Sequence, residues 1–119
     1  MADFEQGDVV KVPFPYTDRA ARQYRPALVV SSHAVESAHG FVWVLMITSA
    51  ANRGWRGDVA ITNLPTAGLP APSVVRTAKI ATIEAGDAVK LGRISASALR
   101  RVLDEVATSI KPSRNRLLS

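Results

Sequence analysis

The residues with the clearest chemical potential are an arginine and a hydroxyl group at the ends of two apolar runs. Arg25 opens a short run, and Pro26 after it restricts the backbone. Thr48 closes a longer run, where its hydroxyl could donate to a phosphate oxygen. Because a planar guanidinium matches phosphate geometry, the two residues suggest phosphate recognition. Each also has an ordinary explanation, since surface arginines are common and threonine favours strands.

The segment Arg53-Gly54-Trp55-Arg56 places an aromatic ring between two cations. This pattern suits a stacked base with a phosphate on either side. Trp55 could equally fold back onto the core. From these residues alone, the chain is a small basic protein that could bind nucleic acid.

Several other kinds of site are missing from the sequence. The chain has no cysteine, which excludes disulfides, thiolate zinc sites, iron–sulfur clusters and a cysteine nucleophile. His33 and His39 do not have the spacing of a helical zinc motif, and we expect both to be solvated in a loop. No glycine-rich phosphate loop, nucleophile elbow or aspartate cluster for two metals occurs. We therefore predict neither a metal ion nor a cofactor.

Size and charge limit the choice further. The 119 residues are enough for one domain, which we expect over residues 1–111 with a basic tail over 112–119. The net charge is +5, and arginine supplies 11 of the 15 basic residues, which indicates a polyanion or an acidic partner. The longest apolar run, 41–47, is too short to span a membrane, and the first residues do not resemble a secretion signal. We expect a cytoplasmic protein.

Short apolar runs separated by polar turns predict a β-rich fold around these residues. We expect strands over 9–14, 27–30, 41–49, 58–62, 73–76 and 79–83. The run 41–49 is apolar at almost every position, so both of its faces should be covered. We expect loops over 16–24, 34–38, 50–57 and 63–72, which are polar or rich in Gly and Pro.

The C-terminal segment changes to a helical period. One apolar stripe is formed by Leu99, Val102, Leu103, Val106 and Ile110. Ser95 is the predicted N-cap, and Pro112 ends the helix after Lys111. Two charge pairs are expected on the exposed side: Arg100 with Asp104, and Arg101 with Glu105. These elements predict a small curled sheet or barrel with one terminal helix.

Seven short motifs follow one another along nearly the whole chain, from Gly7 to Ile110. They are Gly7-Asp8-Val9-Val10, Phe14-Pro15-Tyr16-Thr17-Asp18, Arg25-Pro26-Ala27-Leu28-Val29-Val30, Ile47-Thr48-Ser49, Ser73-Val74-Val75-Arg76, Lys79-Ile80-Ala81-Thr82-Ile83 and Leu91-Gly92-Arg93-Ile94-Ser95. Their order and spacing resemble the MazF/PemK family of bacterial toxins. The resemblance implies a mainly β, SH3-like small β-barrel of the MazF/CcdB type with a C-terminal helix, assembled as a homodimer.

The resemblance also implies an activity and a set of partners. The activity is metal-independent, sequence-selective cleavage of single-stranded RNA, which leaves 2′,3′-cyclic phosphate and 5′-hydroxyl ends and inhibits translation and growth. An acidic antitoxin protein neutralises such a toxin, and the complex is expected to contact operator DNA. We expect an acidic segment of the antitoxin to occupy the RNA groove, since the basic surface would steer it there.

The site residues are carried over position by position. Arg25 matches the family's catalytic arginine, which contacts the scissile phosphate and takes part in proton transfer. Thr48 matches a hydroxyl that hydrogen-bonds the same phosphate. Arg76 matches an arginine that some members use as general acid. The RNA-binding residues are expected to be Asp18, Arg19, Arg22, Gln23, Ser49, Arg53, Trp55 and Arg56.

The chain departs from the family pattern where a carboxylate is usual. Ala78 stands two residues after Arg76, and the loop before Arg25 reads Arg19-Ala20-Ala21-Arg22. Asp18 is the only carboxylate left in that loop and is the candidate substitute base, although an Asx-type turn explains it better. Two other functions therefore stay open. One is a non-catalytic relative that binds nucleic acid or its antitoxin in transcriptional autoregulation, and the other is a gyrase poison that acts through its C-terminal residues.

Overall fold

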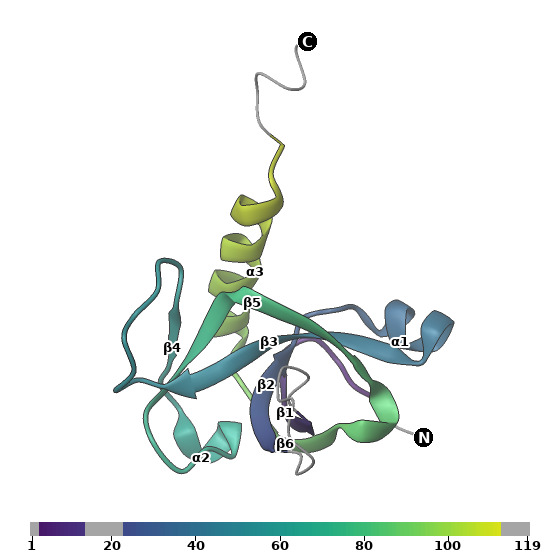
Figure 1. The fold of residues 1–119 in the computed structure, drawn as a ribbon, viewed down its shortest axis with the longest axis horizontal. Coiled ribbons are helices and arrows are strands. Elements are labelled where there is room, and N and C mark those ends of the chain that lie inside the picture. Colours follow the sequence, from purple (N-terminus) through teal and green to yellow (C-terminus); the bar gives the residue numbers. More distant parts are fainter. Residues whose placement is uncertain (1–2, 14–22, 113–119) are drawn as a thin grey trace.

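A computed structural model describes residues 3–13 and 23–112. Within these residues, six strands form one antiparallel sheet in the order β4-β5-β3-β2-β1-β6. The strands are β1 (Asp8–Pro13), β2 (Tyr24–Val29), β3 (Phe41–Ser49), β4 (Val59–Ile61), β5 (Ser73–Glu84) and β6 (Val89–Arg93). The helices are α1 (His33–His39), α2 (Leu64–Ala67), the 3-10 turn η1 (Ala85–Asp87) and α3 (Ala96–Ile110). The sheet curls strongly on itself (Figure 1), which confirms the predicted mainly β, barrel-like fold with a C-terminal helix.

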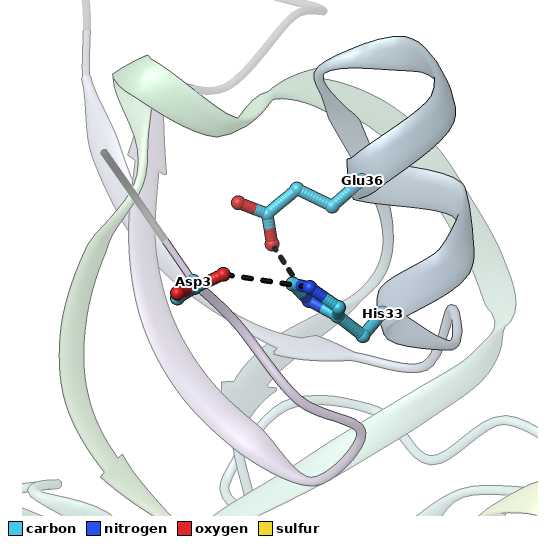
Figure 2. A group of neighbouring side chains, drawn as sticks. All are labelled: Asp3, His33 and Glu36. Atoms are coloured by element: carbon cyan, nitrogen blue, oxygen red, sulfur yellow. Dashed lines mark ion pairs between the residues drawn. The ribbon is translucent and has the colours of Figure 1, made fainter.

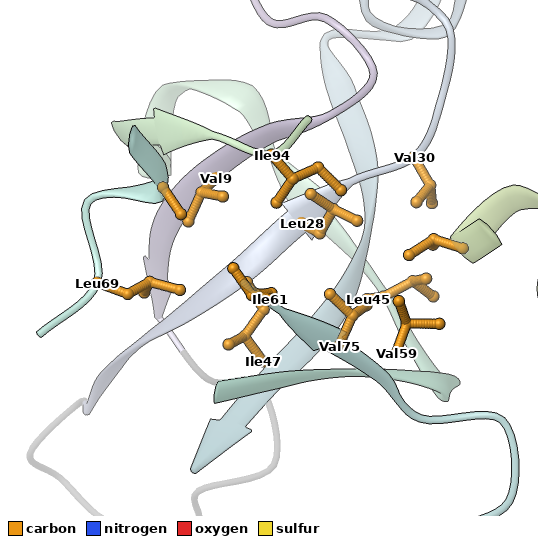
Figure 3. Packing of buried hydrophobic residues seen from close by; sticks show 12 residues of the cluster. Val9, Leu28, Val30, Leu45, Ile47, Val59, Ile61, Leu69, Val75 and Ile94 are labelled. Atoms are coloured by element: carbon orange, nitrogen blue, oxygen red, sulfur yellow. The ribbon is translucent and has the colours of Figure 1, made fainter. Parts of the chain in front are cut away.

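Apolar side chains lie on both faces of the curled sheet and form two clusters. On one face, Leu28, Leu45 and Val75 pack with residues of α2, β4 and α3 (Figure 3). On the other face, Val29, Val44 and their neighbours pack with Phe4 and η1. Successive residues of a strand point to opposite faces, so a near-continuous apolar run such as β3 is covered on both sides, as predicted. The exception is Trp43, which is 44% exposed.

Helix α3 closes the first cluster. The Ser95 hydroxyl accepts a hydrogen bond from the backbone N–H of Ala98 at 3.1 Å, which confirms the predicted N-cap. Val102 is fully buried, but Ile110 is 75% exposed because the last turn of the helix extends beyond the sheet (Figure 1). The predicted apolar stripe is therefore wrong at its final position. Neither predicted charge pair on this helix is within ion-pair distance in the described residues, as expected of long exposed side chains that gain little from pairing.

Two short helices replace predicted loops. Residues 34–38 belong to α1, and residues 64–67 of the expected Pro- and Gly-rich loop form α2. A helix this short has little intrinsic stability and shows no periodic stripe, so tertiary contacts must hold it. Helix α1 has such contacts, since Glu36 is buried against the N-terminal segment and Gly40 caps its end at φ 76°. None of the helices in the described part of the chain is long and apolar enough to cross a membrane.

The region after residue 72 also differs from the prediction. The strands expected over 73–76 and 79–83 are one strand, β5, with a bulge at its centre. Met46 of β3 lies opposite Arg76, whereas the preceding Leu45 lies opposite Ile80. Strand β6, which pairs with β1, was not predicted; its residues are mostly exposed and lack a long apolar run.

Candidate functional site

The register of the central strands brings Arg25, Thr48 and Arg76 to one face of the sheet. Ala27 of β2 lies opposite Met46 of β3 in the last pair of that ladder, and Arg25 and Thr48 each lie two residues beyond it on their own strand. On the other side of β3, Met46 lies opposite Arg76. Residues two apart on a strand point to the same face, so the three side chains start from one face of three neighbouring strands. We call this surface the arginine face.

Arg25 and Thr48 are each in contact with a neutral amide side chain. Arg25 is exposed, and its Nη2 donates to Oε1 of Gln23 at 2.9 Å. Thr48 is half-buried, and its Oγ1 accepts a hydrogen bond from Nδ2 of Asn52. The Arg25 guanidinium is thus exposed on the arginine face, with Gln23 among its hydrogen-bonding partners.

Arg76, in contrast, is nearly buried and held by several groups. Its Nε and Nη2 donate to the two carboxylate oxygens of Asp58 at 3.3 and 3.0 Å. Nη2 also donates to the backbone carbonyl of Arg53 at 2.7 Å. The side chains of Arg76 and Asp58 are only 10% and 12% exposed. This bidentate ion pair joins β5 to the loop formed by residues 50–58.

Trp55 lies against the same arginine. The guanidinium carbon of Arg76 is 4.3 Å from the centroid of the indole ring, a cation–π contact. The backbone N–H of Trp55 donates to Oδ2 of Asp58 at 2.9 Å, and the N–H of Asp58 donates to the carbonyl of Trp55 at 3.2 Å. The side chain stays 45% exposed. Trp55 therefore does not fold back into the core. Its half-exposed ring rests on Arg76, and base stacking by this ring stays a prediction.

Opposing effects act on the pKa of Asp58. Partial burial raises this pKa, whereas hydrogen bonds from the Arg76 side chain and the Trp55 backbone, together with the charge of Arg76, lower it. The net result is a pKa below the ordinary value of 3.8. Asp58 is thus ionised at neutral pH and is a poor proton acceptor.

Asp58 was not among the residues singled out from the sequence. It lies just before β4, level with Arg76 when the pairing of Val59 with Val75 is extended by one residue. One signal in the sequence could have found it. Asp58 is the only carboxylate between Glu36 and Glu84, in a stretch that holds several arginines.

The remaining predicted RNA-binding residues fall into two groups. Gln23, Ser49, Arg53 and Arg56 are exposed near the ends of β2 and β3 or in the loop that follows. Asp18, Arg19 and Arg22 lie outside the described residues. Ala78, at the position where the family resemblance led us to expect an acid, is exposed in the bulge of β5.

A second group of polar side chains lies at the other end of β3. His33 has Nε2 at 3.5 Å from Oδ1 of Asp3 and Nδ1 at 4.0 Å from Oε1 of Glu36 (Figure 2). The potential ligand atoms of these three residues lie within 4.8 Å of one another, so they could hold a metal ion. Glu36 also accepts a hydrogen bond from the backbone N–H of Phe4 at 2.8 Å. Strand β3 has nine residues, about 27 Å of extended chain, which separates this group from the arginine face.

The two histidines are exposed, as expected, but they lie on a helix and not in a loop. His33 begins α1 and His39 ends it. His39 stacks on Phe41, with ring centroids 5.1 Å apart and planes 9° from parallel. They do not converge on one site, and neither lies on the arginine face.

Comparison with known proteins was made at the levels of sequence and fold. No curated protein sequence matches the chain. Among solved structures, MazF from Deinococcus radiodurans superposes with a TM-score of 0.75 at 20% identity, over 94% of this chain and 100% of that one. Mycobacterium tuberculosis toxin MazF-mt6 superposes with a TM-score of 0.70 at 21% identity, over 89% and 98% of the two chains. A mycobacterial endoribonuclease in complex with its cognate antitoxin gives 0.71 at 18% identity, over 95% and 98%.

These similarities support the same fold, and a family model covers most of the sequence. The model describes the PemK-like, MazF-like toxin of type II toxin–antitoxin systems and matches residues 5–110. This span includes β1 to α3 and every described residue of the arginine face. The chain therefore belongs to the PemK-like, MazF-like family of type II toxin–antitoxin toxins.

Proposed function

We propose that this chain is an endoribonuclease toxin that cleaves single-stranded RNA at selected sequences without a metal ion. Cleavage of mRNA would inhibit translation and growth until an acidic antitoxin binds. Family membership supports this proposal, as do the solved relatives that are described as endoribonucleases. The single observation that carries it is the placement of Arg25 and Thr48 on one face of two adjacent strands, each two residues beyond the pair of Ala27 with Met46.

The chemistry fits the groups on the arginine face. In RNA cleavage of this type, the ribose 2′-oxygen attacks the adjacent phosphorus while the bond from phosphorus to the 5′-oxygen of the next nucleotide breaks. The 2′-hydroxyl loses its proton to a base, and the leaving 5′-oxygen gains one from an acid. The products are a 2′,3′-cyclic phosphate and a 5′-hydroxyl. The main contribution of the Arg25 guanidinium is to stabilise the doubly charged phosphorane, with Thr48 as a second donor.

Fewer contacts support the groups proposed to transfer the two protons. Arg76 as general acid stays a prediction, and such a role would run through Nη1, since Nε and Nη2 bind Asp58 and Arg53. Asp58 does not suit the role of base, because its pKa is lowered and both oxygens bind Arg76. Asp18 remains the candidate base, and it lies outside the described residues.

The nuclease proposal is tested with purified protein on a long single-stranded RNA in excess EDTA. We expect discrete cuts with 2′,3′-cyclic phosphate and 5′-hydroxyl ends. Arg25→Ala should lower the cleavage rate by about 10²–10³-fold, the usual effect of losing one transition-state donor. Arg100→Ala is the matched control, since Arg100 is exposed on α3 and should leave cleavage unchanged. Equal cleavage by wild type and Arg25→Ala would contradict the proposed site.

One observation favours a second function. Ala78 stands where the family resemblance led us to expect an acid, and the carboxylate of Asp58 is bound to Arg76. A chain without a working base would bind RNA or its antitoxin without cleaving RNA. Together with the antitoxin, it would bind operator DNA. RNA binding with no cuts by the wild type in the same assay would support this non-catalytic function. The gyrase-poison alternative rests on the last residues of the chain, of which 113–119 lie outside the described part.

A further inference from the structure

The loop of residues 50–58 is anchored to β5 although most of its residues are exposed. Asp58 binds Arg76 through both carboxylate oxygens, and the carbonyl of Arg53 accepts a third hydrogen bond from the same guanidinium. Near the end of the loop, the Thr77 hydroxyl donates to the carbonyl of Gly57 at 2.8 Å. A polar loop normally loses entropy when it binds a ligand. In the loop of residues 50–58, the turn that carries the Trp55 ring is already fixed to β5.

The turn that carries Trp55 is built around Asp58. The carboxylate accepts from the backbone N–H of Trp55, and the backbone N–H of Asp58 returns a bond to the Trp55 carbonyl. Gly57 inside this turn has φ +89°, a left-handed conformation that glycine adopts without strain. One carboxylate thus sets both the backbone under Trp55 and the guanidinium beside its ring.

The contact with Arg76 leaves much of the indole accessible. The guanidinium covers one face of the ring at 4.3 Å from the centroid, yet the side chain is 45% exposed. A half-exposed tryptophan with one face supported is suited to stack on a flat aromatic ligand, and every nucleobase offers such a face. Arg53 and Arg56 are exposed on either side of it, where phosphates of the same strand would pass.

We propose that Asp58 is a positioning residue that holds Trp55 and Arg76 as a rigid platform for one unpaired nucleobase of the RNA. The inference rests on the proposed function and adds to it a residue and a subsite. Asp58 neutralises the charge of Arg76, so the platform contributes base stacking, whereas phosphate attraction comes from Arg53 and Arg56. The two contributions differ in their dependence on salt, because only phosphate contacts release counterions.

The test measures the affinity of a fluorescent single-stranded oligoribonucleotide in an Arg25→Ala background, which keeps the RNA intact. Trp55→Ala should weaken binding by about tenfold, within the range for one stacked base. The matched control is Trp43→Ala, since Trp43 is equally exposed at 44% but lies on β3, and it should bind as tightly as the parent. An oligomer with one abasic nucleotide at the stacked position should bind parent and Trp55→Ala with similar affinity.

Salt dependence separates the platform from the flanking cations. Trp55→Ala and Asp58→Asn should lower affinity without changing the slope of log K against log salt. Arg53→Ala or Arg56→Ala should reduce that slope by about 0.7, the value for one phosphate contact on a single strand. In a Trp43→Phe background, RNA should quench the emission of Trp55, and Asp58→Asn should remove most of this quenching. Asp58→Glu keeps the charge and serves as a second variant if Asp58→Asn unfolds, and it should also reduce quenching by displacing the guanidinium.

The outcomes distinguish this inference from the nuclease proposal. If Trp55→Ala and Trp43→Ala bind RNA equally well, the platform is wrong while cleavage by the wild type can still stand. If the Asp58 variants fold and RNA quenches their Trp55 emission as much as in the parent, Trp55 stacks without Asp58 and the positioning role is wrong. A wild type that neither cleaves nor binds RNA overturns the platform and the proposed function together.

Discussion

Arg25 and Arg76 present the same guanidinium group in two different environments. Arg25 is exposed and donates to the neutral amide of Gln23. Arg76 is nearly buried and bound to both oxygens of Asp58. A guanidinium that already holds a carboxylate has fewer donors left for a phosphate. Because Arg25 is exposed, we propose that it contacts the phosphate, whereas Nε and Nη2 of Arg76 hold the loop of residues 50–58.

The ion pair of Asp58 and Arg76 should make stability depend on acid pH. Asp58 has a folded pKa below 3.8, so its stabilising effect is fully present above that pH. As the pH falls below 3.8, the folded carboxylate is protonated and the effect is lost. Asp58→Asn should lower the free energy of unfolding by about 3 kcal/mol at neutral pH, because it leaves a nearly buried guanidinium without its counter-charge.

Urea unfolding of wild type and Asp58→Asn at several pH values checks this prediction. The difference between the two proteins should be constant near neutral pH and shrink in the acid range below 3.8. Asp104→Asn, on the exposed side of α3, is the control and should change stability little. A difference that does not vary with pH would mean that the charge of Asp58 does not stabilise the fold.

At the scale of secondary structure, two glycines allow α2 and β6 to touch through their backbones. A Cβ atom on Gly92 would lie 2.3 Å from the carbonyl oxygen of Thr66, and one on Gly68 would lie 2.2 Å from that of Leu91. Both distances are far below ordinary contact. The short helix α2 thus covers the edge strand only because neither position carries a side chain.

Gly92→Ala should therefore destabilise the protein by about 3 kcal/mol, as overpacking against a backbone cannot be relieved by a rotamer change. Gly86→Ala is the matched control, because a Cβ there would meet nothing within 4 Å. Thermal unfolding of both variants measures the effect. Equal melting temperatures for the two would show that α2 can move away from β6 at little cost.

At the scale of the whole molecule, the net charge of +5 and the arginine face favour acidic partners. A relative of the same fold was solved with its cognate antitoxin. We expect an acidic segment of this toxin's antitoxin to occupy the arginine face and to compete with RNA. The rate of association should fall as salt is added, since opposite charges steer the encounter.

Competition binding checks this prediction. Saturating antitoxin should raise the apparent Kd of a single-stranded RNA for the Arg25→Ala toxin. Arg100→Ala added to the same protein should leave the competition unchanged, because Arg100 lies on α3. An antitoxin that binds tightly and leaves the RNA affinity unaltered would place the two partners on separate surfaces.

Much of the fold follows from local sequence patterns. The apolar runs predict four of the six strands with boundaries close to those observed, and the 3.6-residue period predicts α3 with Ser95 as its N-cap. The order of short motifs was enough to indicate the toxin family, which the family model confirms. Helices α1 and α2 and strand β6 were not predicted, because contacts distant in sequence hold them and their own residues show no period.

The candidate site depends more strongly on the tertiary structure. The sequence by itself determined which residues could do chemistry, namely Arg25, Thr48 and the cations around Trp55. Only the pairing of β2 with β3 brings Arg25 and Thr48 to one face, since the pairing of residues as distant as Ala27 and Met46 is a property of the whole sheet. Only side-chain packing joins Asp58 to Arg76 across 18 residues and lays Trp55 on the pair. Local patterns in the sequence report residue type and period. The partner of a buried charge, in contrast, is the distant group that the fold brings within hydrogen-bonding distance.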